Sequence, residues 1–234
     1  LIAENNSSRL SSCETMSGEK DILLKTCLNG SSEFMTNASS SVVNMLYNTQ
    51  LMRLAGADGV AAYGAVMYVN FIFVATFLGY AIGCAPVISY HYGAGNHAEL
   101  KNLYKKSMSI ILVWGVILFG AAQLLAPVLS KIFVGYNTGL YAMTLHGFRV
   151  YAIAFLIIGI NIFGSSFFTA LNNGLISAVI SFLRTLVFQV IMVLTLPLWF
   201  GINGIWSAIS IAEALTLIMT TTFFVRQKDK YHYL

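Results

Sequence analysis

Charged residues are scarce in this chain, and the common catalytic motifs are missing from it. Only 9% of the 234 residues are Asp, Glu, Lys or Arg, whereas 57% are hydrophobic, and the mean hydropathy is +0.74. A soluble domain carries about 25% charged residues, so this composition excludes that class and indicates a lipid bilayer. The sequence holds no HExxH, GxSxG or GxxxxGK motif. We therefore expect a membrane protein that is not an enzyme.

Cysteine is also sparse, and strand-sized alternating segments are absent. Cys13, Cys27 and Cys84 have neither metal-ligand nor redox spacing, so the sequence predicts no metal site and no disulfide framework. Without the alternating segments of a membrane barrel, the apolar runs are expected to cross the bilayer as helices.

Long apolar runs predict an all-α membrane protein. Each of five runs exceeds the roughly 20 residues that a spanning helix needs, and a sixth helix at 23–50 precedes them, diluted by polar residues. We expect a polar tail or connector at 1–22, a six-helix lobe at 23–225 and a cytoplasmic tail at 226–234. The five runs are 60–90, 103–129, 148–171, 176–200 and 205–225.

Lys and Arg gather at one set of helix ends. Cytoplasmic flanks of membrane proteins are rich in these residues, so the sequence predicts that both termini are cytoplasmic. The same rule explains the net charge of +4 without a nucleic-acid partner. The richer set is Lys20, Lys25, Lys101, Lys105, Lys106, Arg226, Lys228 and Lys230, against Arg53, Lys131 and Arg149 at the opposite ends.

One face of the first expected helix is polar from end to end. Its members recur every three or four residues, which places them on one side of a helix. Lipid cannot satisfy such a face, so we expect it to line a bundle interior or a wet cavity. Its members are Asn29, Glu33, Asn37, Ser41, Asn44 and Asn48.

Glu33 is the ionisable member of this polar stripe. A carboxylate inside the hydrocarbon costs at least a few kcal/mol, and Asn or Ser could join two helices at lower cost. We therefore interpret Glu33 as a binding residue for a coupling ion or a substrate, with Asn29 and Asn37 beside it. For the Asn and Ser members, helix-to-helix hydrogen bonding explains the pattern equally well.

Further polar residues lie deep in later helices. Asn161, Arg184 and Glu213 are candidate binding residues, but an Arg184–Glu213 ion pair between consecutive helices is a competing interpretation if the two depths match. Pro86 frees a backbone carbonyl and permits a helix to bend, which suits a moving part.

Five short motifs together resemble the second half of a multidrug and toxic compound extrusion (MATE) transporter, nearest to the MepA-like and DinF-like bacterial branch. The likeness runs from about residue 23 to residue 225. The motifs are NGSSE at 29–33, APVISYHYGA at 85–94, GFR at 147–149, ALNNG at 170–174 and GINGIW at 201–206.

The resemblance implies a multi-pass protein of the bacterial inner membrane, with twelve helices in two lobes, that exports organic cations against Na⁺ or H⁺. This chain would supply helices seven to twelve, without the N-terminal lobe and with no cofactor beyond the coupling ion. Glu33 matches the acidic residue of the seventh helix that is linked to cation binding. Asn161 stands where sodium-coupled members have a second acid.

Two alternatives stay open. One is a flippase of lipid-linked precursors from the same superfamily, although Arg184 is the one deep base where such a cavity would need several. The other is a half-transporter fragment that does not transport. The single deep base favours a cationic substrate.

Overall fold

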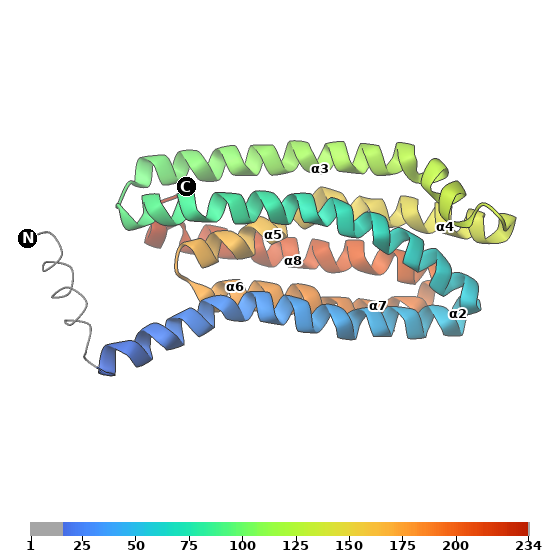
Figure 1. The fold of residues 1–234 in the computed structure, drawn as a ribbon, viewed down its shortest axis with the longest axis horizontal. Helices are drawn as coiled ribbons and strands as arrows, with labels where there is room; N and C mark the ends of the chain where they lie inside the picture. Colours follow the sequence, from blue (N-terminus) through green and yellow to red (C-terminus); the bar gives the residue numbers. More distant parts are fainter. Residues whose placement is uncertain (1–15, 234) are drawn as a thin grey trace, which may run out of the picture.

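The computed structural model describes residues 16–233, except for the side chains of residues 16–22, 24, 25, 28, 29, 31–33, 35 and 36. Residues 1–15 of the expected tail therefore lie outside the described residues. The side chains of Asn29 and Glu33 do so too. The described part is a bundle of helices whose axes run along one common direction (Figure 1).

Helix α2, Met16–Gly93, contains both of the first two expected helices. Its backbone leaves the helical region at Gly56, where φ is 64° and ψ is −153°. This region is open essentially to glycine alone, so the glycine allows the chain to reverse. Figure 1 shows one arm of α2 running along the bundle and the other returning.

The remaining expected helices each have a counterpart. Two of the spans are interrupted without losing their direction: a 3₁₀ turn, η1, joins α4 to α5, and a π-helical segment, η2, joins α6 to α7. The elements are α3 His97–Val134, α4 Thr138–Tyr151, η1 Ala152–Ala154, α5 Phe155–Ala170, α6 Gly174–Phe182, η2 Leu183–Phe188, α7 Gln189–Phe200 and α8 Ile202–Tyr231.

The expected count of six spanning helices needs a correction. Within the described residues, five helices are long and apolar enough to cross a membrane. The count differs because no loop separates the first two expected helices, which form the two arms of α2 around Gly56. The all-α membrane fold itself is confirmed.

The helix ends divide into two groups at opposite ends of the bundle. The α2–α3 and α5–α6 connections lie at the end where the C-terminus lies (Figure 1). The reversal of α2 and the α3–α4 and α7–α8 connections lie at the other end (Figure 1). This arrangement separates Lys101, Lys105 and Lys106 from Lys131 and thus fits the charge grouping on which the orientation rests.

Aromatic rings close the core at the C-terminal end. Tyr233, just beyond α8, is fully buried, and its ring lies 5.0 Å from that of Phe167 and 5.2 Å from that of Tyr104. Burial raises the pKa of Tyr233 well above its usual value. The hydroxyl therefore stays protonated and donates a 2.8 Å hydrogen bond to the carbonyl oxygen of Phe224. These contacts fix the end of α8 to α3 and α5.

Helix α5 is the central element of the bundle. It contacts α2, α3, α6 and α8, and its residues Ile158, Phe163 and Phe167 are almost completely buried. At Gly159 a β-carbon would collide with the ring of Phe77 on α2, so the glycine permits close packing there. Close approach through a small residue is typical of membrane helices.

Candidate functional site

A cavity of about 750 Å³ lies between the two arms of α2 and the helices α4, α5, α7 and α8. It is large enough for a drug-sized molecule, since such sites measure roughly 300 to 1,000 Å³. Its lining includes both polar and aromatic side chains. The polar lining residues are Asn37, Ser40, Asn44, Asn48, Asn70, Arg184, Thr185, Gln189 and Glu213, and the aromatic ones are Tyr47, Tyr63, Phe71 and Tyr151.

An ion pair forms the charged part of the cavity lining. The Arg184 Nε atom donates to both carboxylate oxygens of Glu213, at 2.9 Å and 3.2 Å. The Asn161 Nδ2 group donates to Glu213 Oε2 at 2.7 Å and to the Glu213 carbonyl oxygen at 3.0 Å. The three predicted residues therefore meet, and the Arg184–Glu213 ion pair that the sequence left open is present.

The burial of the two charges is unequal. The Glu213 side chain is 1% exposed, whereas that of Arg184 is 14% exposed. Asn161 is completely buried behind the pair, and its Oδ1 atom has no hydrogen-bond partner within the described residues. Both side chains line the cavity, and the guanidinium belongs to the more exposed of the two.

The π-helical segment η2 explains how Arg184 reaches this position. A π-helix turns less per residue than an α-helix, because its hydrogen bonds close over five residues instead of four. Arg184 and Gln189, five residues apart, consequently come to the same side, and both line the cavity. Single π-helical turns inside α-helices occur often at functional sites.

The polar stripe faces the cavity along part of its length. Asn37, Asn44 and Asn48 line it, and Asn44 accepts a 2.9 Å hydrogen bond from the Tyr63 hydroxyl. Ser41 is exposed and lies outside the lining. The binding roles assigned to Asn29 and Glu33 concern side chains outside the described residues, so they remain predictions.

Several lining residues escaped the sequence analysis. The rings of Tyr47 and Tyr63 stack at 5.0 Å with an interplanar angle of 7° across the two arms of α2. Tyr47 is 3% exposed, and its hydroxyl has no partner within the described part of the chain. Tyr47 follows Val43 by four residues and flanks the polar stripe, but an aromatic residue at helical spacing is also typical of an ordinary core.

Other polar residues only join helices. The hydroxyl of Ser165 on α5 lies 2.9 Å from that of Ser177 and 2.8 Å from that of Ser181, both on α6. Thr169 adds a 2.6 Å contact to Ser177. This network ties α5 to α6 outside the cavity lining.

The expected bend at Pro86 stays a prediction. Pro86 lies inside α2, which continues to Gly93. The non-helical backbone of α2 is at Gly56 and not at Pro86.

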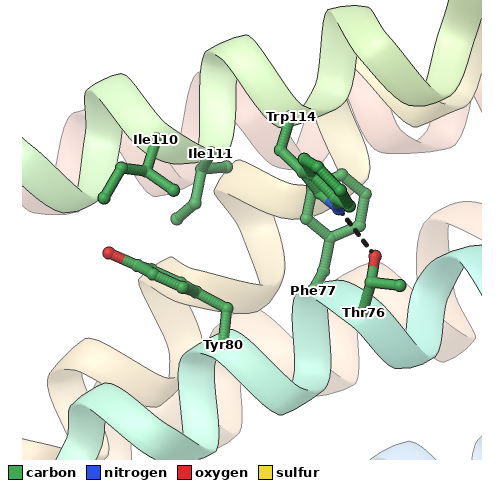
Figure 2. A pocket seen from close by; sticks show the side chains of 6 residues that line it. All are labelled: Thr76, Phe77, Tyr80, Ile110, Ile111 and Trp114. Atoms are coloured by element: carbon green, nitrogen blue, oxygen red, sulfur yellow. Dashed lines mark hydrogen bonds between the residues drawn. The ribbon is translucent and has the colours of Figure 1, made fainter.

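A second and smaller pocket of about 260 Å³ lies between α2 and α3 (Figure 2). Its walls are the apolar side chains of Phe77, Ile110, Ile111 and Trp114, with Thr76 and Tyr80. Trp114 Nε1 donates to Thr76 Oγ1 at 2.9 Å, and the Tyr80 hydroxyl donates to Ser107 at 3.1 Å. The pocket carries no charged group, so it is the weaker candidate for a transport site.

Comparison with known proteins identifies a family whose sequences resemble this chain. The sequence model of the family described as MatE matches residues 34–195. The lipid II flippase MurJ of Bacillus subtilis (strain 168) is 30% identical over 98 residues, which make up 41% of this chain and 18% of that protein.

Solved structures share the fold over nearly the whole chain. A MATE protein solved in complex with MaL6 gives a TM-score of 0.83 at 19% identity, over 92% of this chain and 48% of its own. An outward-facing multidrug resistance MATE family transporter of the MOP superfamily gives a TM-score of 0.80 at 20% identity. The aligned part is 89% of this chain and 47% of that one.

A MOP superfamily transporter from Pyrococcus furiosus Vc1, whose binding pocket is described as reversed in polarity, gives a TM-score of 0.79 at 20% identity. The aligned part is 87% of this chain and 46% of that one. The chain spans about half the length of these solved transporters.

Proposed function

The chain belongs to the MATE family of membrane transporters, and from this premise we propose that it forms one half of a cation-coupled multidrug efflux antiporter. In this proposal the chain is the C-terminal lobe, helices seven to twelve, and a second lobe completes the transport path. The coupling ion is Na⁺ or H⁺, and the substrates are organic cations. Glu33 binds the coupling ion or the cationic substrate, with Asn29 and Asn37 beside it.

The observation that carries this proposal is the cavity among α2, α4, α5, α7 and α8. Substrate sites of such transporters lie near the bilayer midplane, and Arg184 and Glu213 lie well inside their spans. Asn37, Asn44 and Asn48 continue the polar lining toward Glu33, which is one helical turn before Asn37. The aromatic lining residues supply ring faces, and a cation over such a face gains about 0.5 to 2 kcal/mol.

A flippase of lipid-linked precursors is the second candidate. The similarity to the lipid II flippase MurJ supports it, and so does the guanidinium of Arg184 at the cavity wall. The observation against it is that Arg184 is the one basic residue among the described lining residues. A lipid diphosphate would be expected to need more than one.

The orientation yields the first prediction. Both termini are cytoplasmic in this proposal, so the α3–α4 and α7–α8 connections face outward. A cysteine placed at Asn137 or Asn203 should react with an impermeant thiol reagent added to intact cells, whereas one placed at Lys101 should not. If the cysteine at position 101 reacts and the cysteine at position 137 does not, the orientation is reversed.

Transport itself requires two lobes, which is the second prediction. Everted vesicles that contain the complete two-lobe transporter should accumulate a fluorescent organic cation when a Na⁺ or H⁺ gradient is imposed, and dissipation of that gradient should stop the uptake. The chain expressed alone should insert in the membrane without transport, because one lobe offers one wall of the path. If the two-lobe protein moves a labelled lipid precursor and no organic cation, the antiporter proposal is wrong and the flippase candidate replaces it.

A further inference from the structure

We propose that Arg184 is the binding site for an oxyanion, a carboxylate or a phosphate group, on the transported substrate. This inference rests on the proposed function, in which the cavity is part of the substrate path. It adds a chemical class that a cation exporter does not require: the substrate carries an anionic group in addition to its cationic centre.

The first argument is the geometry of the ion pair. Glu213 occupies only the Nε atom of Arg184, to which both carboxylate oxygens are directed. Within the described residues, neither terminal nitrogen of this guanidinium has a hydrogen-bond partner. Arginine has five N–H donors in a planar fork, so the end that carries two of its nitrogens remains available for a second, bidentate acceptor. Carboxylate and phosphate match that fork.

The second argument is the unequal burial of the two charges. Both residues line the cavity, but Glu213 is 1% exposed and Arg184 is 14% exposed, so a molecule in the cavity meets more of the positive member of the pair than of the negative one. A cation that approached Glu213 would also meet the guanidinium 2.9 Å from its carboxylate, which repels it. The pair is neutral in sum, yet its accessible edge attracts anions.

The third argument is that a second donor in the cavity lining lacks an acceptor. The Tyr47 hydroxyl is a donor without a partner in the described part of the chain, although Tyr47 is 3% exposed. A buried donor left unsatisfied is costly. Gln189, which also lines the cavity, carries an amide group that can donate as well. The cavity thus offers the Tyr47 hydroxyl and the Gln189 amide as donors in addition to one fixed positive charge.

The arrangement also explains why Glu213 is present. An unpaired guanidinium in a membrane interior is expensive. The carboxylate offsets that cost, fixes the orientation of the planar group and leaves one edge open. Asn161 holds the carboxylate from behind through its 2.7 Å hydrogen bond. Glu213 and Asn161 therefore position Arg184 and need not touch the ligand.

The test is equilibrium dialysis of the purified full chain in detergent, with four aromatic probes of similar size. Benzoate and phenyl phosphate carry the two oxyanions, benzamide is the neutral control and benzyltrimethylammonium is the cationic one. We expect both anions to bind more tightly than benzamide, and inorganic phosphate to compete with them. Tighter binding of phenyl phosphate indicates a phosphate-bearing substrate, and tighter binding of benzoate indicates a carboxylate-bearing one; either ranking supports the site.

Variants test whether Arg184 is the residue responsible. The double variant Arg184→Gln/Glu213→Gln removes both charges together, leaves none unpaired and should weaken anion binding about tenfold. Glu213→Gln alone should tighten it, because the guanidinium loses the carboxylate that offsets its charge. Arg226→Gln, at the exposed end of α8, is the matched control and should leave binding unchanged. Circular dichroism and gel filtration verify that each variant folds.

Three results would overturn the inference. The anions could bind no better than benzamide, or their binding could be unchanged in the double variant. The third result is that the cationic probe binds the unaltered chain and that Glu213→Gln abolishes this binding. The last would make Glu213 the ligand instead of Arg184. Each of these results concerns binding to this chain alone. The gradient-driven uptake by the two-lobe protein tests the proposed function separately, so the two can fail independently.

Discussion

Replacement of Glu33 by glutamine is expected to abolish gradient-driven export by the complete transporter while its amount in the membrane stays near normal. Glutamine keeps the shape and hydrogen-bonding capacity of the side chain but removes the charge that would hold a cation. Glu33 lies on α2 one turn before Asn37, which is the first of the described side chains along that helix to line the cavity. We expect a loss of transport of at least about a hundredfold, since an ion-coupled cycle stops when its ion is not bound. Uptake of a fluorescent cation in everted vesicles measures this loss.

The same substitution at Glu99 serves as the control. Glu99 lies in the first turn of α3, where it accepts a hydrogen bond from Asn102, and it does not line the cavity. Glu99→Gln should therefore transport normally. Full activity of Glu33→Gln would mean that the polar stripe only packs helices together, which is the alternative that its Asn and Ser members leave open.

The second large effect is expected at the ion pair. Arg184→Met should lower the free energy of unfolding by about 3 kcal/mol, because it leaves the 1% exposed carboxylate of Glu213 without its cation. Methionine keeps the length and apolar packing of the arginine stem. Unfolding of the purified chain in mixed micelles of increasing denaturing detergent, followed by circular dichroism, measures the change.

Two further variants separate the lost charge from lost packing. The double variant Arg184→Met/Glu213→Gln should recover most of the stability, since no buried charge is then unpaired. Arg226→Met, on the exposed surface of α8, should change the unfolding free energy by less than about 0.5 kcal/mol. A double variant as unstable as Arg184→Met would show that the arginine contributes by packing.

The helices could be predicted from the sequence because lipid imposes a simple condition on it. Every backbone group in the hydrocarbon must be satisfied within the segment, so each long apolar run could only be a helix. The runs expected at 103–129 and 205–225 are indeed the cores of α3 and α8. The junction between the first two expected helices was harder to predict. The chain reverses there through the backbone angles of Gly56 and not through a loop of recognisable composition.

The sequence left the meeting of Arg184 with Glu213 open, because the two depths are counted from opposite ends of antiparallel helices. Arg184 is about five residues further from the α7–α8 connection than Glu213. Five residues of helix correspond to roughly 7 Å along the axis. The long arginine side chain crosses this difference, and the π-helical segment directs it toward α8. Neither contribution is visible in residue spacing.

The cavity was predicted only in part. The polar stripe indicated that one face of the first helix meets a wet interior, and Asn37, Asn44 and Asn48 do line the cavity. The tyrosines of the cavity lining could not be foreseen, since an aromatic side chain of a membrane helix can face lipid, pack in the core or line a cavity equally well. Tyr47 and Tyr63 become distinguishable only when the two arms of α2 bring their rings together.

The segment η2 changes how this chain has to be aligned with others. A π-helical turn accommodates one residue more than the α-helical turn it replaces, so in a relative whose corresponding span is α-helical, a one-residue gap belongs within Leu183–Phe188. An alignment without that gap would shift the numbering by one on one side of the turn. It would then assign Arg184 and Gln189 to different faces and conceal a shared cavity wall from any search for conserved positions.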